Sequence, residues 1–241
     1  MAVIDVNRGA KRAREARARL GLDPAAPLPC LLGVVEERAE RPVVVAPLAP
    51  GLAGACVPFG TGRLLFVNGA QAPVRQRFTL AHELGHAWCG HDGTVAVDTF
   101  ATIGGGVTTP YEVQANAFAA EFLIPKVALV ELADGEPGLD EITLVAAHFG
   151  TSALMTLFRY RQLRLISGEA CDALKTRIDD GEHFAAAERL GLAAFTDRLA
   201  TLAPLPYLSP ALQGTRLAAV LGGAAPAEPA LAKAISRLLG G

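Results

Sequence analysis

The stretch RQRFTLAHELGHAWC, residues 75–89, holds two histidines and a glutamate within an amphipathic pattern, and Gly90 follows it. Its apolar residues recur at helical spacing, so the sequence predicts a helix that ends at this glycine. One helical turn separates His82 from His86, so both imidazoles leave the same face and can reach one metal ion. Glu83 can reach a water on that ion. This is the HExxH arrangement of two zinc ligands and a general base.

A third ligand must come from elsewhere in the chain. Five residues are candidates: Cys89, His91, Asp92, Glu112 and Glu121. Cys89 shares the face of His82 but lies roughly 10 Å further along the helix axis, so we interpret it as a small buried cysteine. The metzincin pattern HExxHxxGxxH would need glycine at position 89, which weakens Asp92. His91 is out of that register by one residue. Asp92 and His91 both stay open as weaker alternatives.

A second helix is predicted over residues 110–124, because Thr109 suits the N-cap, Pro110 suits the first helical position and Pro125 ends the pattern. Glu112 and Asn116 share one face of this helix, whereas Glu121 points about 180° away from Glu112. Glu112 is therefore the favoured third ligand, with Asn116 supporting the first histidine. The alternative is a capping box, in which Glu112 bonds the backbone amide of Thr109.

Composition sets broad limits. The chain has 241 residues, 22 Lys and Arg against 24 Asp and Glu, and a net charge of −2, so charge alone does not require a polyanion-binding surface. Its four cysteines are scattered without a CxxC pair, which argues against a disulfide framework or a zinc ribbon. We see no secretory signal and no membrane-spanning segment. We therefore expect a cytoplasmic protein with no membrane partner.

The remaining elements indicate an α+β fold. Residues 8–20 predict a solvated helix and 29–38 a short one, while 42–46, 55–59 and 63–67 predict strands of an antiparallel or mixed meander. Residues 92–109 read as a glycine-rich loop. Residues 139–166 have the outline of a helix-turn-helix, and further helices are predicted at 169–180, 182–201, 209–221 and 227–239. We expect a peptidase-like domain over 1–133, a helix-turn-helix-like segment over 134–167 and an all-α region of unknown role over 168–241.

Three segments together resemble a known family: RQRFTLAHELGH (75–86), EVQANAFAAEFLIP (112–125) and LDEITLVAAHFGTSALMTLFRYRQL (139–163), with FVN at 66–68 upstream. The chain resembles the ImmA/IrrE metallopeptidases over roughly residues 25–166. The resemblance implies a zincin-like fold, a zinc ion on His82, His86 and Glu112, and Glu83 as the base. It also implies cleavage of a partner transcriptional repressor.

The expected chemistry is peptide hydrolysis, with Tyr111 and His91 as weak candidates for stabilising the oxyanion and the strand RLLFVN as a possible edge for an extended substrate. A regulatory protein without turnover, such as a zinc sensor or a toxin–antitoxin component that binds DNA or a repressor, is the competing class. Three arginines, Arg159, Arg161 and Arg164, lie on or near the second helix of the helix-turn-helix, but they make a weak phosphate footprint. Docking on a repressor, or packing on the peptidase domain, is favoured over direct DNA contact.

Overall fold

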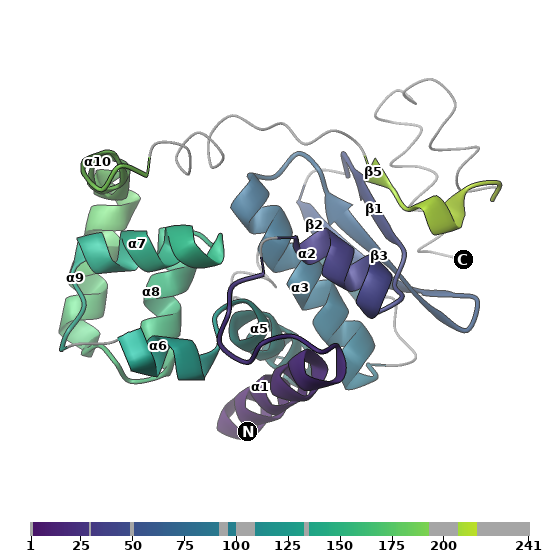
Figure 1. Ribbon diagram of the computed structural model, residues 1–241, viewed down its shortest axis with the longest axis horizontal. Helices are drawn as coiled ribbons and strands as arrows, with labels where there is room; N and C mark the ends of the chain where they lie inside the picture. Colours follow the sequence, from purple (N-terminus) through teal and green to yellow (C-terminus); the bar gives the residue numbers. More distant parts are fainter. Residues whose placement is uncertain are drawn as a thin grey trace.

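A mixed five-stranded sheet forms one side of the molecule (Figure 1). The computed structural model describes residues 2–28, 30–48, 51–91, 96–99, 109–132, 135–192 and 207–215. The strands are β1 (Val43–Ala46), β2 (Leu52–Phe59), β3 (Gly62–Asn68), β4 (Ala96–Thr99) and β5 (Tyr207–Leu208), in the order β4-β2-β3-β1-β5. β1 runs parallel to β3, and the other pairs are antiparallel.

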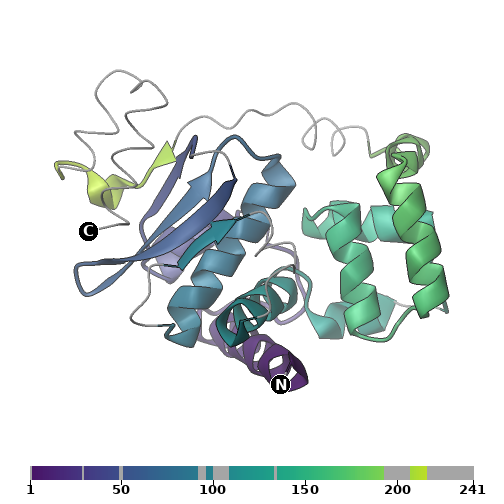
Figure 2. The same ribbon diagram turned by 180° about the vertical axis from the view of Figure 1, so that it is seen from behind.

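Alternation along β3 divides the core between the two faces of the sheet. Leu65 and Val67 join the main core, whereas Leu64 and Phe66 join a smaller cluster that includes Leu212. The main core is covered by α3 (Pro73–Cys89), which lies across the sheet, and by the short helical segment Leu31–Gly33 with its π-helical continuation Val34–Arg38 (Figure 2). Leu212 belongs to a 3₁₀ turn, Pro210–Leu212, after β5.

Two further helices are stacked on α3, on the side away from the sheet. α5 (Pro110–Leu123) packs on α3, and α1 (Ala2–Arg19) packs on α5. The inner face of α1 consists of small residues, because Ala13 and Ala16 are fully buried. Arg17 is also buried there, where its guanidinium donates to the carbonyls of Phe122, Asp23 and Ala26.

A group of short helices follows at the far side of the molecule (Figure 1). They are α6 (Lys126–Leu132), α7 (Leu139–Phe149), α8 (Ala153–Gln162), α9 (Gly168–Asp179) and α10 (Glu182–Arg189). α7 and α8 meet at 105°, and the Ser152 hydroxyl caps α8 by accepting from the Met155 amide. Two helices joined by a turn are therefore present where the sequence predicted them, and their assignment as a helix-turn-helix stays a prediction. No single helix in the described part of the chain is both long and apolar enough to cross a membrane.

The α+β class and the three predicted strands are confirmed, with four corrections. The first helix is half buried against α5 rather than solvated. The glycine-rich loop contains β4, an edge strand that pairs with β2. β3 lies inside the sheet, so RLLFVN offers no free edge. Tyr207–Leu208 pairs with β1, so the C-terminal region is not all-α; the helix predicted over 227–239 lies outside the described residues.

Candidate metal centre

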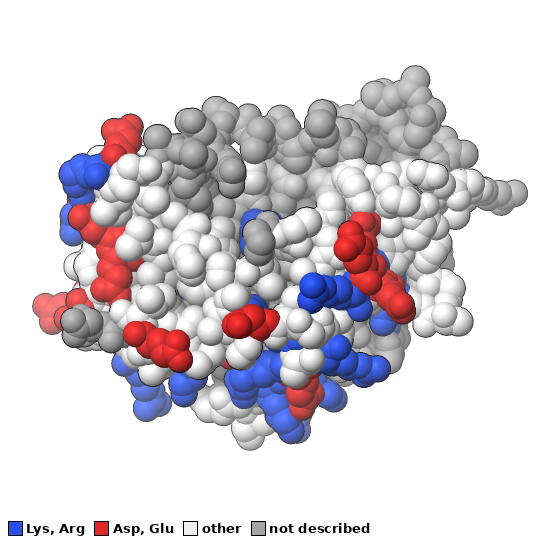
Figure 3. Space-filling model, in the orientation of Figure 1, with Lys and Arg blue, Asp and Glu red and all other residues white. Residues whose placement is uncertain are grey.

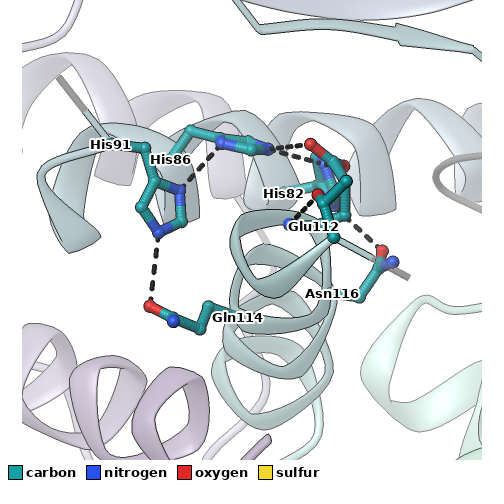
Figure 4. A network of polar contacts seen from close by, with 7 residues as sticks. His82, His86, His91, Glu112, Gln114 and Asn116 are labelled. Carbon is teal, nitrogen blue, oxygen red and sulfur yellow. Dashed lines mark hydrogen bonds and ion pairs between the residues drawn. The ribbon is translucent and has the colours of Figure 1, made fainter. Parts of the chain in front are cut away.

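The packing of α5 on α3 brings together the three side chains that the sequence singled out. Gly90 adopts a left-handed conformation and ends α3, while the Thr109 hydroxyl accepts from the Glu112 amide at the start of α5. His82 Nε2 lies 3.3 Å from Glu112 Oε2, and His86 Nε2 lies 3.4 Å from Glu112 Oε1 (Figure 4). The Glu112 carboxylate thus faces the histidines and not the Thr109 amide that a capping box would require.

The donor set suits a divalent metal ion. One ligand atom from each of His82, His86 and Glu112 lies within 4.8 Å of the others, and the two Nε2 atoms are 3.1 Å apart. Two imidazoles and one carboxylate, with room for a further ligand, are a common catalytic set. Burial raises the pKa of the Glu112 carboxyl, but hydrogen bonds from the two histidines lower it by more, so its pKa is well below the ordinary value.

The second ring nitrogen of each histidine, Nδ1, forms a hydrogen bond with a neighbouring side chain. Asn116 Oδ1 lies 3.0 Å from His82 Nδ1, and His91 Nδ1 lies 2.9 Å from His86 Nδ1 (Figure 4). A partner that accepts a hydrogen bond from Nδ1–H leaves the Nε2 lone pair for a metal ion. The predicted contact from Asn116 is present. The contact from His91 was missed, because it depends on the tight turn at Gly90.

Glu83 is fully buried on α3, close to the beginning of β2. Gly54 of β2 leaves room for it, since a Cβ at position 54 would come within 2.5 Å of Glu83 Oε1. The sheet therefore packs against this carboxylate, which is carried by the same helix as His82 and His86.

The other candidate ligands lie apart from this cluster. Cys89 is partly buried toward α1, and burial raises its pKa to about 11. Glu121 forms a buried ion pair with Arg159 on the opposite side of α5. His91 contacts His86 at Nδ1, and Tyr111 is exposed beside the His91 ring; a role of either residue in stabilising the oxyanion stays a prediction. Asp92 lies outside the described residues.

The arginines near α8 do not form a free basic row. Arg159 is buried, where it bonds Glu121 and the Ile124 carbonyl, while Arg161 and Arg164 are exposed. Lys and Arg side chains gather instead near α1, at the lower edge of Figure 3. This distribution gives α8 little positive charge for contacting phosphates.

A cavity of about 550 Å³ adjoins the cluster at Asn116, which both lines the cavity and bonds His82. Its other walls come mainly from the start of α3 and from α8, and they are largely apolar: Phe78, Leu154, Met155 and Phe158 are among them. α8 and the turn before it thus form one side of a space next to the candidate metal centre.

Comparisons with known proteins agree with this geometry. Residues 46–161 match the model of the IrrE N-terminal-like domain, a peptidase family. The chain is also 35% identical over 99 residues to the radiation response metalloprotease IrrE of Deinococcus radiodurans, an alignment that covers 39% of this chain and 30% of that protein. The matched region contains all three residues of the cluster and Glu83.

Proposed function

We propose that the chain, whose residues 46–161 match the IrrE N-terminal-like domain, is a zinc-dependent endopeptidase of the ImmA/IrrE type that cleaves a partner protein. The observation that carries the proposal is the cluster of His82, His86 and Glu112, with the buried carboxylate of Glu83 next to it on α3. Zinc is the metal that this donor set favours, because two imidazoles and one carboxylate leave a position open on a tetrahedral ion.

The chain's own residues account for the proton transfers. A zinc ion on the cluster would act as a Lewis acid toward the scissile carbonyl and would acidify a water. Glu83 accepts the proton of the attacking water and delivers it to the amine that leaves. Asn116 keeps the His82 ring oriented by bonding Nδ1 at 3.0 Å. Burial of Glu83 and His82 keeps competing water away from these groups.

The proposed substrate is an extended segment of a transcriptional repressor, as the family resemblance implies. β4 ends the sheet on the side of β2, so its outer edge suits strand addition better than β3 does. The apolar cavity next to Asn116 suits a bulky apolar side chain of the same segment. The exposed Phe158 of α8 sits on this cavity, so the helix-turn-helix takes part in docking the repressor.

The test is co-incubation of the zinc-loaded chain with a repressor encoded by a neighbouring gene, followed by mass spectrometry of the products. Glu83→Gln should abolish cleavage and leave one zinc bound, because the amide keeps the shape of the side chain but cannot accept the proton. Glu131→Gln, an exposed change on α6, is the matched control and should cleave normally. Full activity of Glu83→Gln would refute the mechanism. Stoichiometric zinc without cleavage of the wild-type substrate would favour a sensor without turnover.

A further inference from the structure

A chain of hydrogen bonds runs from the metal cluster to the N-terminal helix. His86 Nδ1 lies 2.9 Å from His91 Nδ1, and His91 Nε2 lies 3.3 Å from Gln114 Oε1 (Figure 4). Gln114 Nε2 in turn donates to Asp5 Oδ1 at 2.8 Å. Asp5 and His91 are each only 7% exposed, so the chain is largely shielded from water. It links α3, the second residue after its end (His91), α5 and α1.

The donors and acceptors along this chain have one consistent direction. The Asp5 carboxylate can only accept, so the Gln114 amide nitrogen faces it and the amide oxygen faces His91. That oxygen accepts from His91 Nε2–H, which leaves a lone pair on His91 Nδ1. This lone pair accepts from His86 Nδ1–H, so in the zinc-loaded protein the Nε2 lone pair of His86 would be directed at the metal ion.

Close packing of α1 on α5 makes the last bond of the chain possible. Gly9 lies one helical turn after Asp5, and a Cβ on Gly9 would come within 2.1 Å of the Gln114 carbonyl oxygen. Only a glycine allows the two helices to approach so closely at this point. α1 precedes residues 46–161, so this contact comes from outside the matched domain.

We propose that Asp5, Gln114 and His91 form a positioning relay that sets the tautomer and ring orientation of His86, which makes the N-terminal helix part of the metal centre. The inference rests on the proposed function only in taking His86 as a zinc ligand. Asn116 orients the His82 ring through one direct hydrogen bond, whereas the relay orients the His86 ring through three consecutive hydrogen bonds. Outer-shell partners of this kind change metal affinity by about 10- to 100-fold.

The first experiment measures zinc affinity against a chromophoric chelator and the visible spectrum of the cobalt-loaded protein. Asp5→Ala, Gln114→Leu and His91→Phe should each weaken zinc binding by roughly tenfold or more and alter the cobalt bands. Asn116→Ala is the positive control. Asn7→Ala, an exposed change on α1, is the matched control and should leave affinity unchanged.

A compensating pair separates the relay from simple packing. Gln114→Glu alone places a second carboxylate against Asp5, so zinc affinity should fall. Adding Asp5→Asn to Gln114→Glu supplies an amide donor to the new carboxylate, which still accepts from His91, so affinity should recover. A packing role predicts no such recovery, because every substituted side chain has nearly the same volume.

Long-range ¹H–¹⁵N NMR of the zinc-loaded wild-type chain reads the tautomers without any substitution. The relay requires the proton of His91 on Nε2 and that of His86 on Nδ1. The opposite His91 tautomer would overturn the relay. Folded Asp5→Ala and Gln114→Leu variants that bind zinc as tightly as the wild type would also overturn it. A wild-type chain that binds no stoichiometric zinc would instead remove the proposed function, and the relay with it. The two failures are therefore distinguishable.

Discussion

Replacement of Gly54 by alanine should disable catalysis without removing the metal. The new Cβ would lie 2.5 Å from Glu83 Oε1, 2.6 Å from Thr79 Cγ2 and 2.8 Å from the Phe66 carbonyl oxygen. Ordinary contact begins at 3.4 Å, so the Glu83 oxygen would have to retreat by about 0.9 Å. β2 is paired with β3 on one side and β4 on the other, so the strand cannot move away easily.

The size of the effect follows from that displacement. A misplacement of about 1 Å in a catalytic group costs on the order of 100-fold in rate. Overpacking of this kind costs about 1–3 kcal/mol of unfolding free energy, so we expect a folded protein with a lower melting temperature. His82, His86 and Glu112 are not among the residues nearest to the new Cβ, so zinc affinity should stay within about twofold of the wild type.

The assay is kcat for repressor cleavage at saturating substrate, together with zinc titration and thermal unfolding. Gly69→Ala is the matched control, because its new Cβ would meet its nearest atoms at 3.4 Å, an ordinary contact. A Gly54→Ala variant with wild-type kcat and stability would refute the placement of Glu83 against β2. Loss of zinc in this variant would contradict the separation between the base and the ligands.

Two further predictions concern residues outside the chemistry. Glu121→Ala should lower the free energy of unfolding by about 3 kcal/mol or more, because it leaves the buried guanidinium of Arg159 without its carboxylate. Zinc affinity should not change. Chemical denaturation and zinc titration test this prediction, and a loss of zinc binding would instead make Glu121 a ligand. Burial raises the pKa of Cys89 to about 11, so this thiol should react far more slowly with iodoacetamide at pH 8 than the exposed Cys30. Peptide mapping measures both rates, and equal rates would contradict the burial of Cys89.

The sequence predicted the two helices that carry the cluster because their signals are local. Apolar spacing and Gly90 bounded α3, and Thr109 with Pro110 bounded α5. The side on which each residue lies follows from the helical period, so Glu112 and Asn116 could be assigned to the same face. Their contacts with His82 agree with that assignment.

The features that the sequence did not predict depend on contacts between distant segments. The buried face of α1 is made by alanines and Gly9, which alternate in the sequence with charged residues. A solvated helix can have the same pattern. β4 is four residues long and lies in a glycine-rich stretch, so only its pairing with β2 identifies it. His91 reaches His86 because Gly90, with φ of 67°, turns the chain back. That left-handed cap was the signal available for finding it.

The central claim is that His82, His86 and Glu112 together hold one zinc ion. A crystal of the zinc-loaded chain, with diffraction recorded on both sides of the zinc absorption edge, tests it directly. We predict one anomalous peak about 2.0–2.2 Å from both Nε2 atoms and from a Glu112 oxygen, with Glu83 outside bonding distance. A peak coordinated by His91, Cys89 or Glu121, or no peak at the cluster, would contradict the account.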